Sequence, residues 1–273
     1  MKLFIQKFGA NFKPTFWSKY CQTELAKDLV IANWCDYKFE GEIQHGKRLE
    51  IVGAVRPTVK KYTEGVDIEI ETLGDASQHL DIEFADYFAF YVDDVDQAQS
   101  VPGLMERYQE KAVHGLAVAR DTYVANLIKG ATNATTATGN DAEAVKEALD
   151  NAIVALRERN FDEAGVIEIT PAVYNVFKNY LITLSTNNPE LIKKGVVGKY
   201  DDFDVIMSNN MAKDSSHVYC DIRGKKAIAF AGQINEVEAL RAEKRFKDIV
   251  RGLDTFGAKV IDEARIQVVK VPV

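Results

Sequence analysis

Three carboxylates, Asp93, Asp94 and Asp96, follow an aromatic run in the stretch FAFYVDDVDQAQS, and carboxyl groups so close together could bind a divalent cation or transfer protons. A calcium loop also needs a glycine turn and a distal glutamate, and neither is present here. The acids are followed by Ser100 and Pro102, residue types that favour the start of a helix. The sequence therefore favours a strand-to-helix junction over a metal site.

The histidines and cysteines give no stronger indication of chemistry. His217 and Cys220 form a single His-x-x-Cys within a strand-like pattern, whereas a zinc site needs three or four ligands, so core packing is favoured. No second motif makes His45, His79 or His114 a catalytic base. The cysteines are too few for a disulfide framework, and we expect buried thiols at Cys21, Cys35 and Cys220.

Two glycine-containing stretches are similar to phosphate-binding loops but do not match them. GLDTFGAK places its lysine one position too late, and GVVGKY has Lys193 where the first glycine should be. The signatures of serine hydrolases, zinc proteases and dinucleotide-binding enzymes are absent from the sequence. The sequence thus predicts no catalytic residue, no metal ligand and no cofactor, although an α+β enzyme without a familiar motif stays open as an alternative.

The composition is that of an ordinary folded protein, with 47% hydrophobic and 27% charged residues, and the length of 273 residues allows one or two domains. The apolar runs are too short to cross a membrane, and lysines interrupt the first residues too early for a secretory signal. A net charge of −7 argues against a reader of nucleic-acid sequence. We therefore expect a cytoplasmic chain without a membrane partner.

The charges are separated along the chain. Residues 1–61 carry 11 Lys and Arg against 6 Asp and Glu, whereas residues 62–100 carry 11 Asp and Glu and no Lys or Arg. Each charge alone is consistent with a solvated surface, because exposed ion pairs contribute little. A separation this sharp indicates two surfaces that meet, either within one chain or between copies.

The first hundred residues contain three elements that are not self-sufficient. Residues 18–35 have apolar side chains at helical spacing and predict a short amphipathic helix on an extended arm. Residues 47–55 and 66–73 predict a β-hairpin with a long polar tip, which is marginal alone. Residues 80–92 have apolar side chains at even positions, interrupted only by Asp86, and predict a half-buried strand.

The rest of the chain alternates helices and strands. Residues 104–131 predict a helix of about 28 residues and about 42 Å, long for a compact domain. Asp141 opens a second helix, and an α+β unit of one helix and several short strands follows. Residues 246–271 predict strands around turns, with Gly252 and Gly257 supplying the breaks.

Four stretches together resemble the major capsid proteins of tailed bacteriophages, which share the HK-97-like fold. They are ELAKDLVIANWCDYKFEGEIQHGKRLEIVG, LDIEFADYFAFYVDDVDQAQS, ARDTYVANLIKGA and FKDIVRGLDTFGAKVIDEARIQVVKV. The resemblance implies an N-terminal arm at 1–37, an extended loop at 38–75, a peripheral domain with a spine helix at 76–130, an axial domain at 131–233, and return strands of the peripheral domain at 234–273. The aspartates that follow the aromatic run would then mark the turn from a peripheral strand into the spine.

The resemblance also implies a function and partners. It predicts a non-enzymatic subunit that self-assembles as hexamers and pentamers into a closed icosahedral shell around double-stranded DNA, which it contacts without sequence specificity. A separate scaffolding protein, a portal and a decoration protein are the implied partners. Assembly is expected in the bacterial host cytoplasm, and the chain is expected to remain in the virion capsid. An encapsulin-like bacterial nanocompartment shell is the nearest alternative.

The separated charges give the expected contact between subunits. We expect the basic arm and hairpin of one copy to dock on the acidic stretch of the next, a contact that salt should weaken. The candidate interface residues are Lys7, Lys13, Trp17, Lys19, Arg56, Lys60, Lys61, Glu64, Asp67, Glu69 and Glu71.

Overall fold

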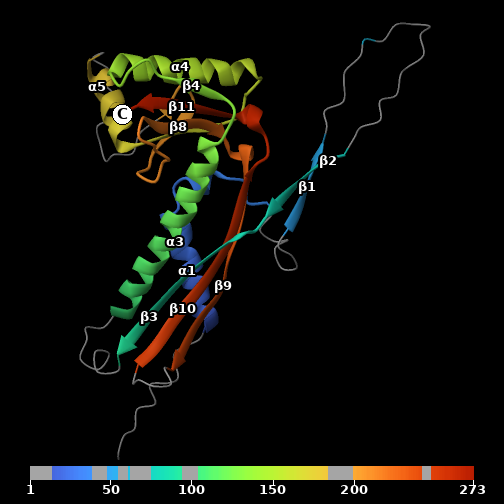
Figure 1. The fold of residues 1–273 in the computed structure, drawn as a ribbon, viewed down its shortest axis with the longest axis vertical. Helices are drawn as coiled ribbons and strands as arrows, with labels where there is room; N and C mark the ends of the chain where they lie inside the picture. Colours follow the sequence, from blue (N-terminus) through green and yellow to red (C-terminus); the bar gives the residue numbers. More distant parts are fainter. Residues whose placement is uncertain are drawn as a thin grey trace, which may run out of the picture.

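The computed structural model describes residues 14–38, 48–54, 61, 75–93, 104–183, 199–241 and 247–273. The backbone alone is described at 14–20, 52–54, 75–77, 92–93, 104–106, 179–183, 233–236, 239, 241 and 248. Figure 1 shows two bodies: a long, narrow sheet with a long helix beside it, and a second body of a wider sheet and two further helices. A two-stranded hairpin extends sideways from the point where the two bodies meet.

The narrow body is a three-stranded antiparallel sheet covered on one face by helices. Its strand order is β3–β10–β9, formed by β3 (Phe84–Asp93), β10 (Lys247–Val260) and β9 (Ile228–Arg241). The helices are α3 (Leu104–Lys129) and α1 (Pro14–Asp28). With 26 residues, α3 is about 39 Å long, so the prediction of a long helix from residue 104 is confirmed.

The face of β3 toward α3 is aromatic, as the period of two predicted. The ring of Phe84 lies 4.3 Å from that of Tyr123, and the ring of Phe90 lies 6.0 Å from that of Tyr108, measured between ring centroids. Phe88 packs on the same core. This packing stabilises the contact between strand and helix over most of the length of β3.

The hairpin consists of β1 (Arg48–Ala54) and β2 (Asp75–Asp81), which pair antiparallel along their whole length. The second hairpin strand predicted at 66–73 lies outside the described residues, and the observed partner of β1 is β2. The strand predicted at 80–92 is confirmed from Phe84 onward as β3, but Leu80 and Asp81 belong to β2, so the prediction joined two strands into one. The apolar alternation runs through this break because both strands pack even-numbered residues into a core, Leu80 with Ala229 and Ala231 and Phe88 with Phe230, so the sequence pattern does not reveal the division.

The second body is a mixed six-stranded sheet with two helices on one face (Figure 1). The strand order is β4–β11–β8–β5–β7–β6, formed by β4 (Ala134–Thr136), β11 (Ile266–Pro272), β8 (His217–Gly224), β5 (Gly165–Ile169), β7 (Phe203–Met207) and β6 (Lys199–Tyr200). The helices are α4 (Ala142–Glu158) and α5 (Pro171–Thr183). Asp141 precedes α4 as predicted, and the buried face of α4 repeats every three or four residues from Ala144 to Leu156.

The glycines of the last segment do not interrupt a strand, contrary to the prediction. β10 continues through both Gly252 and Gly257, and β9 runs on to Arg241 instead of ending as a short strand. The glycines are needed for close approach: a Cβ on Gly252 would lie 2.5 Å from the ring of Phe88, and one on Gly257 would lie 2.3 Å from the carbonyl oxygen of Asp81. Glycine here marks tight packing and not a turn.

Candidate subunit interface

The outer face of the three-stranded sheet carries apolar side chains that the described part of the chain leaves exposed. Tyr87 and Tyr91, which alternate with the buried aromatic residues of β3, are 76% and 60% exposed. The register places Tyr91 opposite Ile249, and Ile249 opposite Leu240, in one row across the sheet. Leu253, 40% exposed, lies opposite Tyr87 in a second row.

These rows border a shallow groove of about 490 Å³ on the same face. Between them lies an ion pair in which the guanidinium of Arg251 is 2.5 Å from the carboxylate of Glu238. A cluster of exposed apolar side chains on one face is typical of a surface that meets another protein. We call the face formed by Tyr87, Ala89, Tyr91, Glu238, Leu240, Ile249, Arg251 and Leu253 the outer sheet face.

The hairpin is the second exposed element. Its base is covered, because Leu49, Ile51 and Leu80 pack against Ala229 and Ala231 of β9. Beyond the base, Figure 1 shows the two strands leading away from both bodies. A two-stranded sheet is not stable alone in water, so this element needs a neighbour.

Most of the predicted interface residues lie outside the part of the chain that the structure describes. This holds for Lys7, Lys13, Arg56, Lys60, Glu64, Asp67, Glu69 and Glu71. Trp17 and Lys19 lie in the first part of α1, residues 14–20, where only the backbone is described, and Lys61 is exposed. The expected charged contact is therefore untested, while the tyrosines of the outer sheet face were missed. The sequence feature that could have predicted these exposed tyrosines is the apolar character of both faces of residues 84–91.

The segment after α1 is held by a carboxylate of α3. Asp121 accepts hydrogen bonds from the backbone N–H groups of Val30, Ile31 and Ala32, at 2.9 to 3.1 Å. Burial raises the pKa of Asp121, and these hydrogen bonds oppose that rise. Because the N–H groups are engaged by a side chain, α1 ends at Asp28, and the predicted helix over 18–35 is wrong beyond that residue.

A buried ion pair joins α3 to β10. The Nε of Arg120 donates a hydrogen bond to Oδ2 of Asp254 at 2.8 Å, and its Nη2 donates to Oδ1 at 2.5 Å. The guanidinium also lies over the rings of Phe230 and Phe256. Burial raises the pKa of Asp254, and Arg120 opposes that rise. Asp86, the single polar residue in the apolar pattern of β3, is the register partner of Asp254 and lies beside this pair.

The side chains that the sequence analysis considered for catalysis or metal binding have structural roles. Cys21, Cys35 and Cys220 are buried free thiols, as predicted, and burial raises the pKa of Cys220 to about 12. His114 is exposed and lies 3.2 Å from the carboxylate of Asp28. β3 ends at Asp93 and α3 begins at Leu104, which agrees with the predicted strand-to-helix junction, while Asp94 and Asp96 themselves lie outside the described residues. In the described ranges no three His, Cys, Asp or Glu side chains converge as metal ligands would.

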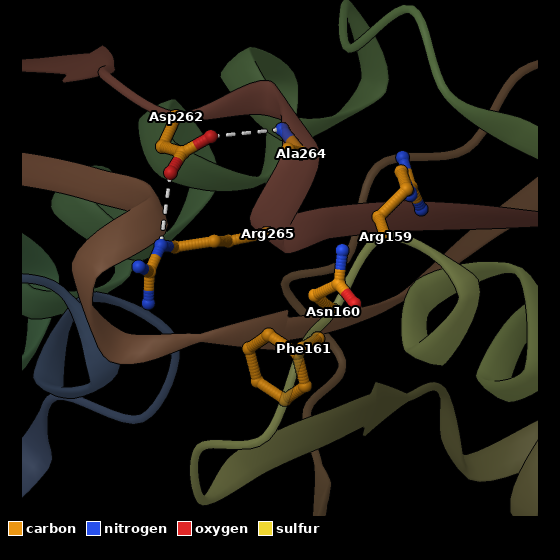
Figure 2. A pocket seen from close by; sticks show the side chains of 6 residues that line it. All are labelled: Arg159, Asn160, Phe161, Asp262, Ala264 and Arg265. Carbon is orange, nitrogen blue, oxygen red and sulfur yellow. Dashed lines mark hydrogen bonds and ion pairs between the residues drawn. The ribbon is translucent and has the colours of Figure 1, made fainter. Parts of the chain in front are cut away.

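A small polar hollow of about 250 Å³ lies between the end of α4 and the short 3₁₀ helix η5 (Glu263–Arg265), as Figure 2 shows. The carboxylate of Asp262 accepts hydrogen bonds from Nε of Arg265 and from the backbone N–H of Ala264. Arg159 donates to the carbonyl of Ala155 and to Gln267. The charged groups that line the hollow already form hydrogen bonds with other groups of the same chain. This arrangement indicates a structural role and not a reactive centre.

No described helix is long and apolar enough to cross a membrane. An elongated sheet with a long helix, a projecting hairpin and a second α/β body is the arrangement that the resemblance to HK-97-like capsid proteins implies. Structural comparison agrees: a chain from Mycobacterium phage Che8 is similar at a TM-score of 0.75 and 25% identity, covering 88% of this chain and 90% of that one. The α+β prediction is thereby confirmed.

Two further solved structures show the same fold at lower identity. A chain of the capsid of Cyanophage P-SCSP1u matches at a TM-score of 0.71 and 13% identity, over 100% of this chain and 92% of that one. A chain of the capsid of Ralstonia phage GP4 matches at 0.66 and 11%, over 88% and 87%. A search of curated proteins finds no match.

The family model described as phage capsid protein matches residues 56–269. The chain belongs to this phage capsid protein family, and it is a major capsid shell protein. The family indicates a structural component of the virion capsid. None of these findings favours the nanocompartment shell or the enzyme that the sequence left open.

Proposed function

We propose that this capsid protein forms a closed icosahedral shell of hexamers and pentamers around double-stranded DNA, joined by docking of the hairpin of one copy on the outer sheet face of the next. The observation that carries this proposal is the exposed apolar face itself. Tyr87, Tyr91 and Leu253 are held in place by a rigid sheet, yet the described chain leaves them in water. The matching element is the hairpin, which projects from the place where the two bodies meet.

A contact of modest strength, repeated by every subunit, is enough to stabilise a closed shell. Burying apolar surface stabilises an interface by about 25 cal/mol per Å², and a specific contact commonly covers about 800 Å² on each partner. The outer sheet face and one hairpin supply such a contact once per copy. In a closed shell every subunit gives and receives it, so moderate affinities sum to a stable particle.

The domain assignment follows from the same proposal. The three-stranded sheet with α3 forms the peripheral domain, the six-stranded sheet with α4 and α5, including β11, forms the axial domain, and residues 1–37 form the arm. We also propose that the basic residues of arm and hairpin, among them Lys60 and the exposed Lys61, approach the acidic stretch 62–100 of a neighbour. Unlike charges in adjacent segments fit a contact that guides association.

A scaffolding protein, a portal and a decoration protein complete the proposed set of partners, with assembly in the host cytoplasm. The DNA inside would be contacted without sequence specificity. The net charge of −7 supports this, because an acidic wall does not trap phosphate. No catalytic step is proposed for the chain.

Particle formation tests the function directly. We expect the purified chain to form closed, uniform particles in negative-stain microscopy. Tyr87→Asp with Tyr91→Asp should abolish particles while circular dichroism stays unchanged, because a charge on this face cannot be buried against a neighbour. Val154, 54% exposed on α4, supplies the matched control, and Val154→Asp should still assemble.

Two outcomes would contradict the proposal. A wild-type chain that stays monomeric at high protein concentration under every salt condition would overturn the shell function. Normal particles from the double tyrosine variant would leave the function in place but exclude the outer sheet face as the contact.

A further inference from the structure

Three charged side chains are enclosed between the six-stranded sheet and the segment that follows α1. Glu168 of β5 and Asp221 of β8 are register partners, and Arg223 of β8 stands beside them. All three side chains are completely buried. The Nη2 of Arg223 donates a hydrogen bond to Oε1 of Glu168 at 2.7 Å, and its Nε lies 3.1 Å from Oδ2 of Asp221.

The charge count of this cluster is unbalanced. Two carboxyl groups face one guanidinium, so the buried site carries a net negative charge whenever both carboxyl groups are ionised. In the described residues, Oε2 of Glu168 and both oxygens of Asp221 receive no hydrogen bond from a donor. A proton held by one carboxyl supplies the missing donor and makes the site neutral, which burial strongly favours.

The same arginine holds the backbone of the N-terminal segment. The Nη2 of Arg223 donates to the carbonyl of Ile31 at 2.8 Å, and its Nη1 donates to the carbonyl of Trp34 at 2.6 Å. Asp121 of α3 holds the N–H groups of residues 30–32 from the other side. The segment is therefore fastened by one cation to the six-stranded sheet and by one anion to α3.

The surroundings contain few other ionisable groups. From the N-terminal segment the thiol of Cys35 approaches Arg223, and burial raises the pKa of that thiol to about 12, so it stays neutral. From α3 the carboxyl of Asp121 approaches the segment, and it accepts hydrogen bonds from the backbone N–H groups of residues 30–32. The register partners from β11 and β7 on the same face are apolar, namely Ile266, Val268 and Ile206.

We propose that Glu168, Asp221 and Arg223 form a proton-dependent clasp, which holds residues 31–35 on the six-stranded sheet while one proton remains on the two carboxyl groups and loosens when both are ionised. Arg223 is then drawn toward two carboxylates and away from the carbonyls of the segment. The clasp is a property of the single chain. Its use in the shell, to release the N-terminal region as protons are lost, rests on the proposed function.

The direction of the pH dependence follows from the shifts. Burial raises the pKa of Asp221 to about 6 and raises the pKa of Glu168 well above its ordinary value, in each case against the attraction of Arg223. The clasped state thus binds more protons than the released state. The clasped state is therefore most stable, relative to the released state, at low pH. This stability declines as the pH rises through about 6 and declines further up to the pH at which Glu168 ionises.

Hydrogen exchange of the whole chain tests the clasp. We expect the backbone amides of residues 30–35 to lose protection as the pH rises from 5 to 8.5, after correction for the intrinsic exchange rate. The loss should reach about tenfold per pH unit over the range in which the clasped state binds one proton more than the released state. Amides of α4, which lies on the opposite face of the sheet, should show no such trend.

Conservative variants separate the clasp from general stability. Glu168→Gln keeps a hydrogen-bonding side chain but cannot ionise, so its protection profile should be markedly flatter than that of the wild type. Glu163→Gln is the matched control, because Glu163 also lies 2.7 Å from an arginine, Arg265, but at the surface. That variant should keep the wild-type profile.

A wild-type profile that is flat from pH 5 to 8.5 overturns the clasp without need of any variant. A Glu168→Gln profile as steep as that of the wild type overturns the assignment to these carboxyl groups. Particle formation is scored on the same preparations by microscopy. If the chain forms particles but the protection of residues 30–35 does not change with pH, only the clasp is excluded. If that protection falls with pH but no particles form, only the shell function is excluded.

Discussion

At the scale of residues, buried charges decide how the parts of this capsid protein are joined. Arg120 and Asp254 lie 134 positions apart and connect α3 to β10. Asp121 fastens the segment after α1 to α3. Each of these groups is enclosed by apolar side chains, so each is costly to leave without its partner.

The Arg120–Asp254 pair gives a prediction about stability. Asp254→Ala leaves a buried guanidinium without its carboxylate, and we expect the free energy of unfolding to fall by about 3 to 5 kcal/mol. The measurement is chemical denaturation of unassembled subunits. Glu238→Ala breaks the Arg251 pair at the surface and should cost less than about 1 kcal/mol. Equal losses in the two variants would show that the buried pair has no special role.

At the scale of elements, close packing determines where strands continue and where they separate. β10 pairs with β3 on one side and with β9 on the other. At Gly257 it also passes close to the chain that leaves the hairpin. This contact sets the base of the hairpin against the three-stranded sheet and so fixes the direction in which the hairpin projects.

Gly257→Ala tests this contact. The new Cβ would lie 2.3 Å from the carbonyl oxygen of Asp81, a backbone atom that cannot rotate away, so we expect a loss of about 1 to 3 kcal/mol in the free energy of unfolding. Limited proteolysis should also cut the hairpin faster. Gly115→Ala is the control, because Gly115 is exposed within α3 with nothing near its Cβ position. That variant should gain about 0.5 to 1 kcal/mol. A stable Gly257→Ala chain would show that the hairpin base is not tightly packed.

At the scale of the whole molecule, one strand connects two hydrophobic cores. Along β11, Ile266 and Val268 point into the core shared with α1 and α3, whereas Val269 and Val271 belong to the core beneath α4 and α5. The subunit is thus two bodies with a common strand. The exposed outer sheet face and the hairpin lie outside both cores, which is why the proposed function assigns them to neighbouring copies.

The separated charges lead to a prediction about assembly. Raising the salt concentration from about 0.05 M to 0.5 M should slow particle formation by about tenfold or more, since steering between unlike charges is screened. Light scattering gives the rate. Lys60→Glu with Lys61→Glu should slow assembly at low salt, whereas Lys225→Glu, on an exposed lysine of the short helix η4 (Lys225–Ala227), should not. Rates that respond neither to salt nor to the charge reversal would exclude this contact.

The sequence by itself determined those features that depend on neighbours a few residues away. The helical period of 104–131, the start of α4 after Asp141, the aromatic alternation of β3 and the buried thiols could all be predicted, because local spacing reports which face of an element is shielded from water. The resemblance to phage coat proteins came from the order of these elements.

Tertiary structure alone decided which segments meet. Several features depend on contacts between distant parts of the chain. β1 pairs with β2, and β10 passes through Gly252 without a break. Arg223 lies between two carboxyl groups and two carbonyls of the N-terminal segment. Spacing along a strand shows that a face is buried but not what covers it. The partner is chosen by packing and charge balance over the whole fold, and these act only once the chain has brought the partners together.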